Sequence, residues 1–288
     1  MIQALTGQLL IGLINGSFYA LLSLGLAIIF GLLGVVNFAH GAQYMLGAFV
    51  AWMAMQYLHI DYWWALILTP LAVGLFGMLL ERLMLRRLYR LDPLYGLLLT
   101  FGVALVLEGV FQNAFGISGN SYPVPELLQG GTNLGFMYLP KYRVWVVIVS
   151  IVVCFSSWFV IEKTRLGSYL RAGTENPALL QAFGVNVPLM LTLTYGFGVA
   201  LAAFAGVMAA PIYQVTPLMG SGVIMVVFAV VVIGGMGSIA GSIVTGLGLG
   251  LIEGLTKFFY APASDVIVFV VMALVLLVRP AGLFGRQH

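Results

Sequence analysis

The chain has 288 residues, of which 62% are hydrophobic and only 7% are charged, and its formal net charge is +3. A soluble domain carries about 25% charged residues, so this composition excludes a soluble globular protein. It predicts an all-α polytopic membrane protein with the lipid bilayer as its solvent. A span needs about 20 apolar residues, so we expect one transmembrane domain over residues 1–288 with about eight to ten helices. The few basic residues are clustered, and we expect no nucleic acid partner.

The first two apolar segments, residues 9–30 and 41–58, enclose a polar stretch in a region without charged residues. Four residues of this stretch share one helical face at i, i+3, i+4 and i+7: His40, Gln43, Tyr44 and Gly47. Asn37 precedes them. Unpaired polar groups in lipid cost several kcal/mol, so this face either packs against another helix or lines a translocation path or gate. We leave the same two alternatives open for His40.

The third and fourth spans are expected at residues 62–80 and 94–115. The loop between them, residues 81–92, carries four arginines, which places it in the cytoplasm by the positive-inside rule. Glu108 lies within the fourth span. A carboxyl group inside a membrane faces protein or water, so Glu108 either has a role in the path or pairs with a polar group on a neighbouring helix. The loop at 116–143 is expected outside.

The fifth span, residues 144–161, leads into a second basic loop at 162–188, which is expected in the cytoplasm. Thr174, or Asn176 before Pro177, predicts the start of a short helix that ends at Gly184. Its expected apolar face consists of Ala178, Leu179, Ala182 and Phe183. The polar face is poor in Lys and Arg, which favours docking to a soluble partner over binding to the membrane surface.

The sixth span is expected at residues 189–210 and the last at 266–278. Residues 223–252 would form a helix of about 45 Å, too long for one span, and the Gly-rich run 234–241 divides them. Nine passes then place the N-terminus outside and the C-terminus inside. Gly235 and Gly237 in this run either allow tight packing or expose backbone to a path. The Gly-rich turns near Gly41 and Gly241 also predict an internal repeat.

Enzyme signatures and metal-ligand patterns are missing from the sequence. There is no G-x-x-x-x-G-K-[S/T] and no H-E-x-x-H, and the three histidines form no i, i+4 pair. Cys154 is the single cysteine, so no disulfide framework exists. We therefore expect a chain that is not an enzyme and holds no metal or cofactor. A secondary transporter or channel and a membrane scaffold remain as alternatives to an ATP-driven transporter.

Five stretches, taken together, resemble the permease subunits of branched-chain amino acid ABC importers, the LivH-like family. They are Val-Asn-Phe-Ala-His-Gly at 36–41, Thr-Phe-Gly at 100–102 with Leu-Glu-Gly at 107–109, Arg-Ala at 171–172 through Gly-Val-Asn at 184–186, Ile-Gly-Gly-Met-Gly-Ser-Ile-Ala-Gly at 233–241, and Arg-Pro-Ala-Gly-Leu-Phe-Gly at 279–285. The resemblance covers nearly the whole chain in order.

This resemblance implies an importer in the bacterial inner membrane that works by alternating access. Its expected partners are a second, homologous permease, two cytoplasmic ATPases that bind ATP and Mg, and a periplasmic substrate-binding protein. The loop at 162–188 would be the coupling loop, with Arg171, Ala172, Glu175, Asn176, Ala178 and Gly184 at the ATPase contact. The implied substrate is a branched-chain amino acid; similar permeases serve urea, amides or small organic acids.

Overall fold

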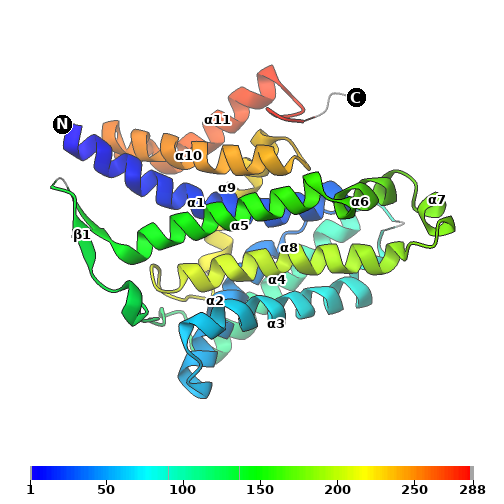
Figure 1. The fold of residues 1–288 in the computed structure, drawn as a ribbon, viewed down its shortest axis with the longest axis horizontal. Coiled ribbons are helices and arrows are strands. Elements are labelled where there is room, and N and C mark those ends of the chain that lie inside the picture. The colour runs from blue at the N-terminus through cyan, green and yellow to red at the C-terminus, as the bar shows by residue number, and fades with distance from the viewer. Residues whose placement is uncertain (1, 90, 136, 286–288) are drawn as a thin grey trace.

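The computed structural model describes residues 2–89, 91–135 and 137–285, with the side chains of Thr174 and Glu175 outside the description. Helices dominate this part of the chain (Figure 1), as predicted. The first half contains α1 (Ile2–Leu33), α2 (Ala39–Leu58), α3 (Tyr62–Leu83), α4 (Pro93–Phe115) and α5 (Lys141–Lys163), with a short hairpin of β1 (Gly131–Asn133) and β2 (Tyr138–Pro140) before α5. The second half contains α6 (Arg165–Glu175), α7 (Pro177–Ala182), α8 (Val187–Ala209), α9 (Met219–Gly234), α10 (Ile239–Phe259) and α11 (Ser264–Val278).

Each of the nine predicted apolar segments forms a helix. Within the described residues, seven stretches are long and apolar enough to cross a membrane: α1, α3 with the short helix after it, α4, α5, α8, α10, and α11 with the short helix before it. The break expected at residues 234–241 is confirmed, because α9 ends at Gly234 and α10 begins at Ile239. The predicted internal repeat is not confirmed: Gly41 lies within the first turn of α2, whereas the chain turns ahead of α10 at Gly235 and Gly237.

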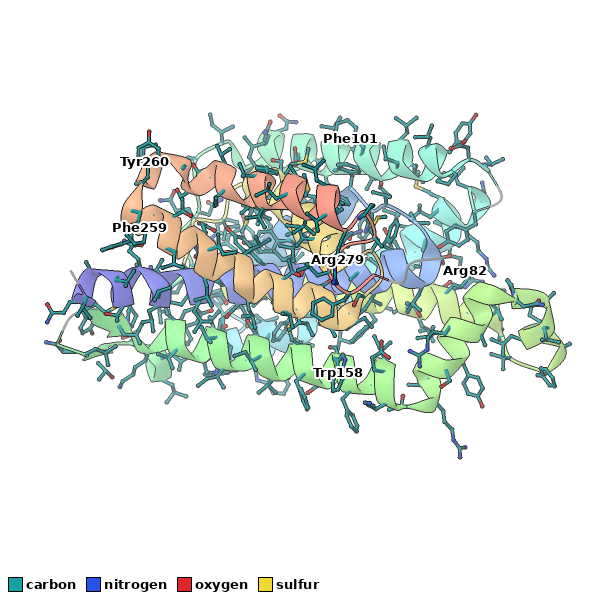
Figure 2. The ribbon with its side chains drawn as sticks, turned by 90° about the horizontal axis from the view of Figure 1, so that it is seen from above. Arg82, Phe101, Trp158, Phe259, Tyr260 and Arg279 are labelled. Atoms are coloured by element: carbon teal, nitrogen blue, oxygen red, sulfur yellow. The ribbon has the colours of Figure 1, made fainter. Side chains whose placement is uncertain are left out.

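The two ends of the bundle differ in charge. The β-hairpin lies at one end and α6 and α7 at the other (Figure 1). Figure 2 shows Phe259 and Tyr260 at the first end and Arg82 toward the second. More basic residues of the described chain lie toward the α6–α7 end than at the other end: Arg82, Arg86, Arg87, Lys163, Arg165, Arg171 and Arg279, against Lys141, Arg143 and Lys257. The positive-inside rule predicts from this difference that the α6–α7 end is the cytoplasmic one, and the two ends are named cytoplasmic and outer on that basis.

The most buried long helix is α1, which packs along α10 and against α8, α5 and α9. Its contact with α10 is antiparallel and is made by small residues. A side chain added at Gly250 would overlap the backbone of Gly12 and Gly16, and one at Gly246 would overlap Ala20. These spacings of four residues allow the two backbones to touch, which gives dispersion energy to helices that have no hydrophobic driving force in lipid.

Two helices begin deep inside the bundle. The imidazole Nε2 of His40, in the first turn of α2, lies 3.0 Å from the carbonyl oxygen of Leu22. Leu22 lies eleven residues before the end of α1 at Leu33, about 16 Å along the axis. Gly41 of α2 touches Gly220 of α9, so α9 begins at the same depth. Residues 34–38 and 210–218 must therefore re-enter the membrane as non-helical backbone.

A pair of glycine substitutions in α10 tests the α1–α10 contact. Gly250→Ala should destabilise the protein by about 1–3 kcal/mol, because the methyl group overlaps α1. Gly248→Ala, two residues away, meets no atom within 4 Å and should leave stability unchanged or raise it through helix propensity. Thermal unfolding of the two purified variants in detergent measures the difference. Equal melting temperatures would contradict the proposed interface.

Candidate functional site

The starts of α2 and α9 face each other in the interior of the bundle. Gly41 and Gly220 are both buried, and an added side chain on either would overlap the backbone of the other. Neither helix has a side-chain cap at its N-terminus, a feature shared with α5, α6 and α11, but α2 and α9 begin in the interior of the bundle. The first N–H groups of a helix lack intrahelical partners, and the helix dipole places partial positive charge there. Two such ends therefore create a positive potential in a medium of low dielectric.

Hydrogen bonds to side chains and to a neighbouring loop hold the two re-entrant segments. The Thr100 hydroxyl of α4 donates to the Val36 carbonyl at 3.2 Å and accepts from the Phe38 N–H at 3.1 Å. In the second segment, Val215 exchanges two backbone hydrogen bonds with Asn120 of the outer loop, at 2.9 and 3.0 Å. Backbone groups at membrane depth need such partners, and these bonds fix where α2 and α9 begin.

Three of the polar residues predicted near the first hairpin are fully buried in packed contacts. The Asn37 amide donates to Gln43 Oε1 at 3.1 Å, and the Gln43 amide donates to the Tyr195 hydroxyl of α8 at 3.3 Å. His40 Nε2 must carry a proton, because its partner, the Leu22 carbonyl oxygen, can only accept. Asn37, His40 and Gln43 are each 0% exposed. These contacts lock α2 to α1 and α8.

Tyr44, from the same predicted face, instead lines a cavity of about 340 Å³ in the outer half of the bundle. We call this space the outer cavity. Its lining comes from α1, from Tyr44, from the segment between α8 and α9, and from the first turns of α9. The α1 residues are Asn15, Phe18, Tyr19 and Leu22, and the others are Tyr213, Gln214, Thr216, Met219, Gly222 and Val223.

A partly buried carboxyl group, that of Glu253, lies behind the polar side of the outer cavity. Glu253 of α10 accepts a hydrogen bond of 2.8 Å from the Tyr19 hydroxyl and one of 3.4 Å from the Asn15 amide. The Tyr213 hydroxyl in turn donates to the Asn15 side-chain oxygen at 3.3 Å. This group of Glu253, Tyr19, Asn15 and Tyr213 was not predicted from the sequence. The spacing i, i+3, i+4, i+7 of the four α1 residues was the signal that could have found it.

Glu108 lies on a different side of the helix starts. It lines a smaller cavity of about 140 Å³ together with Gly41, Ala42, Gly220 and Ser221. Its carboxyl group therefore lies close to the first turn of α9, where negative charge complements the helix dipole. Glu108 does not meet the Asn37, His40 and Gln43 group, so the structure divides the residues predicted for the path between separate environments.

The predicted residues Gly235 and Gly237 lie at the cytoplasmic end. They adopt positive φ angles of 99° and 87°, which glycine tolerates without a Cβ clash. The backbone of Gly237 touches Gly31 of α1, and Gly235 touches Gly285. The two glycine-rich turns thus meet at the inner end, and no space for a small molecule separates them there.

Another carboxyl group that was not predicted from the sequence, that of Glu81, lies near the α6–α7 end and is fully buried. Glu81 of α3 is 0% exposed and accepts hydrogen bonds from the Thr192 hydroxyl of α8 and, at 3.0 Å, from the Tyr89 hydroxyl. Burial, with the neighbouring Glu81 charge, raises the pKa of the Tyr89 phenol above its usual range. The phenol therefore stays protonated at neutral pH and remains a donor to Glu81.

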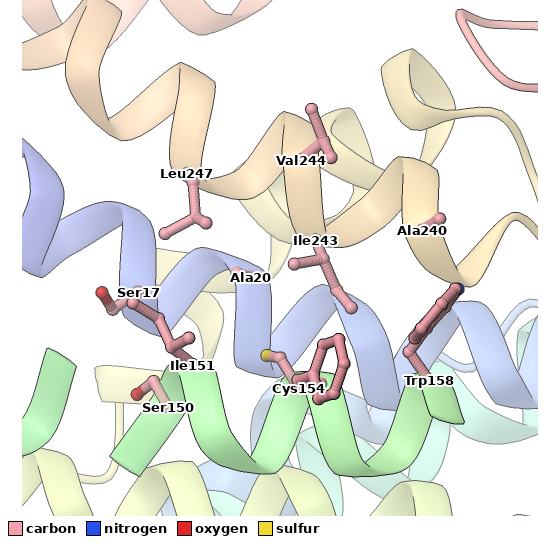
Figure 3. Close-up of a pocket in the computed structure, with 11 residues that line it drawn as sticks. Ser17, Ala20, Ser150, Ile151, Cys154, Trp158, Ala240, Ile243, Val244 and Leu247 are labelled. Carbon is pink, nitrogen blue, oxygen red and sulfur yellow. The ribbon is translucent and has the colours of Figure 1, made fainter. Parts of the chain in front are cut away.

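An apolar groove lies between α1, α5 and α10 (Figure 3) and has a volume of about 260 Å³. Side chains such as Ile151, Phe155, Trp158 and Leu247 line it. The Ser17 hydroxyl is bonded to the Leu13 carbonyl of its own helix. The Ser150 hydroxyl is buried without a hydrogen-bond partner among the described residues. One neutral hydroxyl does not replace the hydration of a charged or zwitterionic solute, so the groove suits an apolar group better.

The predicted coupling loop forms two helices at the cytoplasmic end. The Asn176 side chain caps α7 by accepting from the Leu179 N–H at 3.0 Å, and Gly184 follows the helix with φ +83°, as expected. Arg171 of α6 forms an ion pair with Glu162 at 3.3 Å, and Ala172 and Ala178 are exposed. The side chain of Glu175 lies outside the described residues. The structure thus brings these residues together on one projecting element.

The predicted apolar face of α7 is exposed, and a further apolar residue of α7, Leu180, faces the protein instead. Leu180 packs inward and is 8% exposed, while Leu179 and Phe183 are 55% and 77% exposed.

No group of three or more His, Cys, Asp or Glu side chains suited to a metal ion occurs within the described part of the chain.

Comparison with known proteins identifies relatives over nearly the whole chain. Residues 8–276 match the family model of the branched-chain amino acid transport system permease component. The high-affinity branched-chain amino acid transport system permease protein LivH of Escherichia coli K12 is 31% identical, over 98% of this chain and 96% of its own. BraD of Pseudomonas aeruginosa, described in the same words, is 32% identical with the same coverage. E. coli LivM, a permease protein of the same kind of system, is 27% identical over 92% of this chain and 67% of its own. No solved structure gives a significant match.

The buried amide network predicts a stability difference between two glutamines of α2. Gln43→Leu removes the partners of Asn37 and Tyr195 and should cost about 1–3 kcal/mol, because two buried polar groups lose their hydrogen bonds. Gln56→Leu, at an exposed position of the same helix, should change stability by less than about 0.5 kcal/mol. Thermal unfolding of both variants is the measurement. A Gln43→Leu protein as stable as the wild type would show that the network is dispensable for packing.

Proposed function

The chain belongs to the family of permease components of branched-chain amino acid transport systems, and on this premise we propose that it is the transmembrane permease subunit of an ATP-binding-cassette importer in the bacterial inner membrane. Its cargo is a branched-chain or similar hydrophobic amino acid. The chain itself is not an enzyme. ATP and Mg bind to two cytoplasmic ATPase subunits, and a periplasmic binding protein delivers the substrate to the outer end.

The observation that carries the proposal beyond the family is the α6–α7 element. It projects at the basic end of the bundle, and α7 exposes Leu179 and Phe183 next to each other at its surface. Leu166 and Tyr169 of α6 are also exposed, at 62% and 46%. Large apolar side chains outside the membrane are typical of a helix that docks into a groove of a soluble partner. The coupling contact with an ATPase accounts for them.

A second permease subunit accounts for the exposed face of α4 and α9. Ser221 and Gly222 lie on the exposed side of α9 at mid-depth, and the partly exposed Glu108 carboxyl lies in the adjacent cavity. Small and polar residues in a membrane pack against other helices rather than lipid. The 27% identity to LivM, a permease protein whose system also has LivH, supports pairing with a homologous subunit.

These contacts support transport by alternating access. In the described structure the inner turns touch at Gly31 and Gly237, while the outer cavity leaves polar space between the helices. Closure of the ATPases on ATP binding moves α7, and α7 is joined directly to α8. Because α8 packs on α1, α2 and α3, a shift of α7 reaches the helices around both the cavity and the inner contact.

The α7 surface gives the test of ATPase coupling. Leu179→Asp combined with Phe183→Asp should abolish co-purification of the ATPase and ATP-driven uptake, because two carboxylates would be buried at the docking surface without partners. Leu127→Asp in the outer loop, where the leucine is 77% exposed, is the matched control and should retain the ATPase. The measurement is ATPase stoichiometry after affinity purification of the permease from membranes that contain all subunits. Stoichiometric ATPase bound to the double variant would refute the coupling assignment.

A further inference from the structure

The outer cavity joins groups of opposite polarity. On one side, Met219 and Gly222 of the first turn of α9 and Tyr44 of the second turn of α2 line it, beside the uncapped start of α9. On the other side, Tyr19 and Asn15 line it, held by the Glu253 carboxylate. A helix start attracts negative charge, and a carboxylate attracts positive charge. The cavity is therefore polarised along the direction from α9 to α10.

Tyr44 offers a hydrogen-bonding group to this space. Its side chain is 5% exposed and lines the cavity, and its hydroxyl has no hydrogen-bond partner among the described residues. The neighbouring phenols Tyr19 and Tyr213 do have partners, at 2.8 and 3.3 Å. The Tyr44 hydroxyl is accessible from the cavity rather than enclosed by protein, so it can donate a hydrogen bond to a polar group bound there.

The remaining wall is apolar. Phe18, Leu22, Met219 and Val223 line the cavity between its two polar ends. The volume of about 340 Å³ equals that of roughly ten water molecules in the liquid and lies at the small end of ligand sites. A small solute with one anionic group, one cationic group and an aliphatic chain fits this arrangement.

We propose that the outer cavity binds the α-amino acid itself, with its carboxylate at the start of α9 and the Tyr44 hydroxyl, and its ammonium at the Tyr19, Asn15 and Glu253 side. The aliphatic side chain lies against Phe18, Leu22 and Val223. This inference rests on the proposed function and adds the position and orientation of the substrate within the membrane domain. A paired subunit on the exposed side of α9 would close the site.

Uptake by the complete transporter tests the two polar contacts. Tyr44→Phe and Glu253→Gln should each raise the KM for uptake of leucine about tenfold or more, because each removes one interaction with a charged group of the substrate. Tyr260→Phe and Glu126→Gln change the same residue types at exposed outer positions and should leave KM unchanged. If both cavity variants assemble normally and their KM values lie within twofold of the wild type, the proposed substrate site in the outer cavity is wrong.

Filling the cavity gives a variant that keeps the fold. No atom lies within 4 Å of the position that a Cβ at Gly222 would take, so Gly222→Leu adds a side chain beside the cavity without overlap. It should abolish uptake with an unchanged melting temperature and an unchanged content of both the ATPase and the second permease subunit. Gly102→Leu of α4, also free of neighbours within 4 Å, is the control and should transport normally. Normal uptake by Gly222→Leu would contradict the proposal.

Photolabelling locates the substrate without relying on rates. A diazirine analogue of leucine, irradiated with the purified complex and mapped by mass spectrometry, should label peptides that contain Phe18, Leu22 or Val223. Labelling confined to the apolar groove at residues 150–158 would overturn the site while leaving the transporter assignment intact. A wild-type complex that contains no ATPase, or that imports no amino acid, would instead refute the proposed function.

Discussion

The structure depends on one constraint, that backbone polar groups inside a membrane must find hydrogen-bond partners within the protein. Two non-helical segments, residues 34–38 and 210–218, enter the bundle, and the Thr100 hydroxyl and the outer-loop residue Asn120 supply bonds to them. These bonds set the depth at which α2 and α9 begin. Glycine at positions 41 and 220 then allows the two helix starts to touch. The cavities on either side follow from this contact.

Close helix packing and the polar cavity occupy different parts of the bundle. The α1–α10 contact uses small residues over much of its length and leaves no room for a solute, and the inner turns meet at Gly31 and Gly237. Polar volume occurs instead in the outer half, beside the helix starts. The end predicted to be cytoplasmic carries most of the basic residues and the projecting α7, while the other end carries the β-hairpin. A transport cycle needs both ends, and α8 connects them through its contacts with α1, α2, α3 and α7.

Three carboxyl groups within the spans have different surroundings, which indicates different roles. Glu81 is enclosed by hydroxyl donors from α8 and the loop after α3, an arrangement that fixes helices. Glu253 orients two cavity-lining side chains of α1. Glu108 lies at the α4–α9 surface beside Ser221, where a second subunit would cover it. A carboxyl group in lipid is costly, and each of these lies against protein polar groups rather than hydrocarbon.

The sequence alone determined the features that arise from local patterns. Apolar run length predicted the nine helical segments, glycine chemistry predicted the break before α10, and the order Asn176, Pro177 and Gly184 predicted α7, because caps and turns act over a few residues. Only the tertiary structure decided that Tyr44 faces a cavity while Gln43 is locked to Tyr195, and that Glu253 meets Tyr19 and Asn15 across 234 and 238 residues. Helical periodicity gives a face but not the neighbour of that face, and the depth of a re-entrant segment depends on partners far away in the chain.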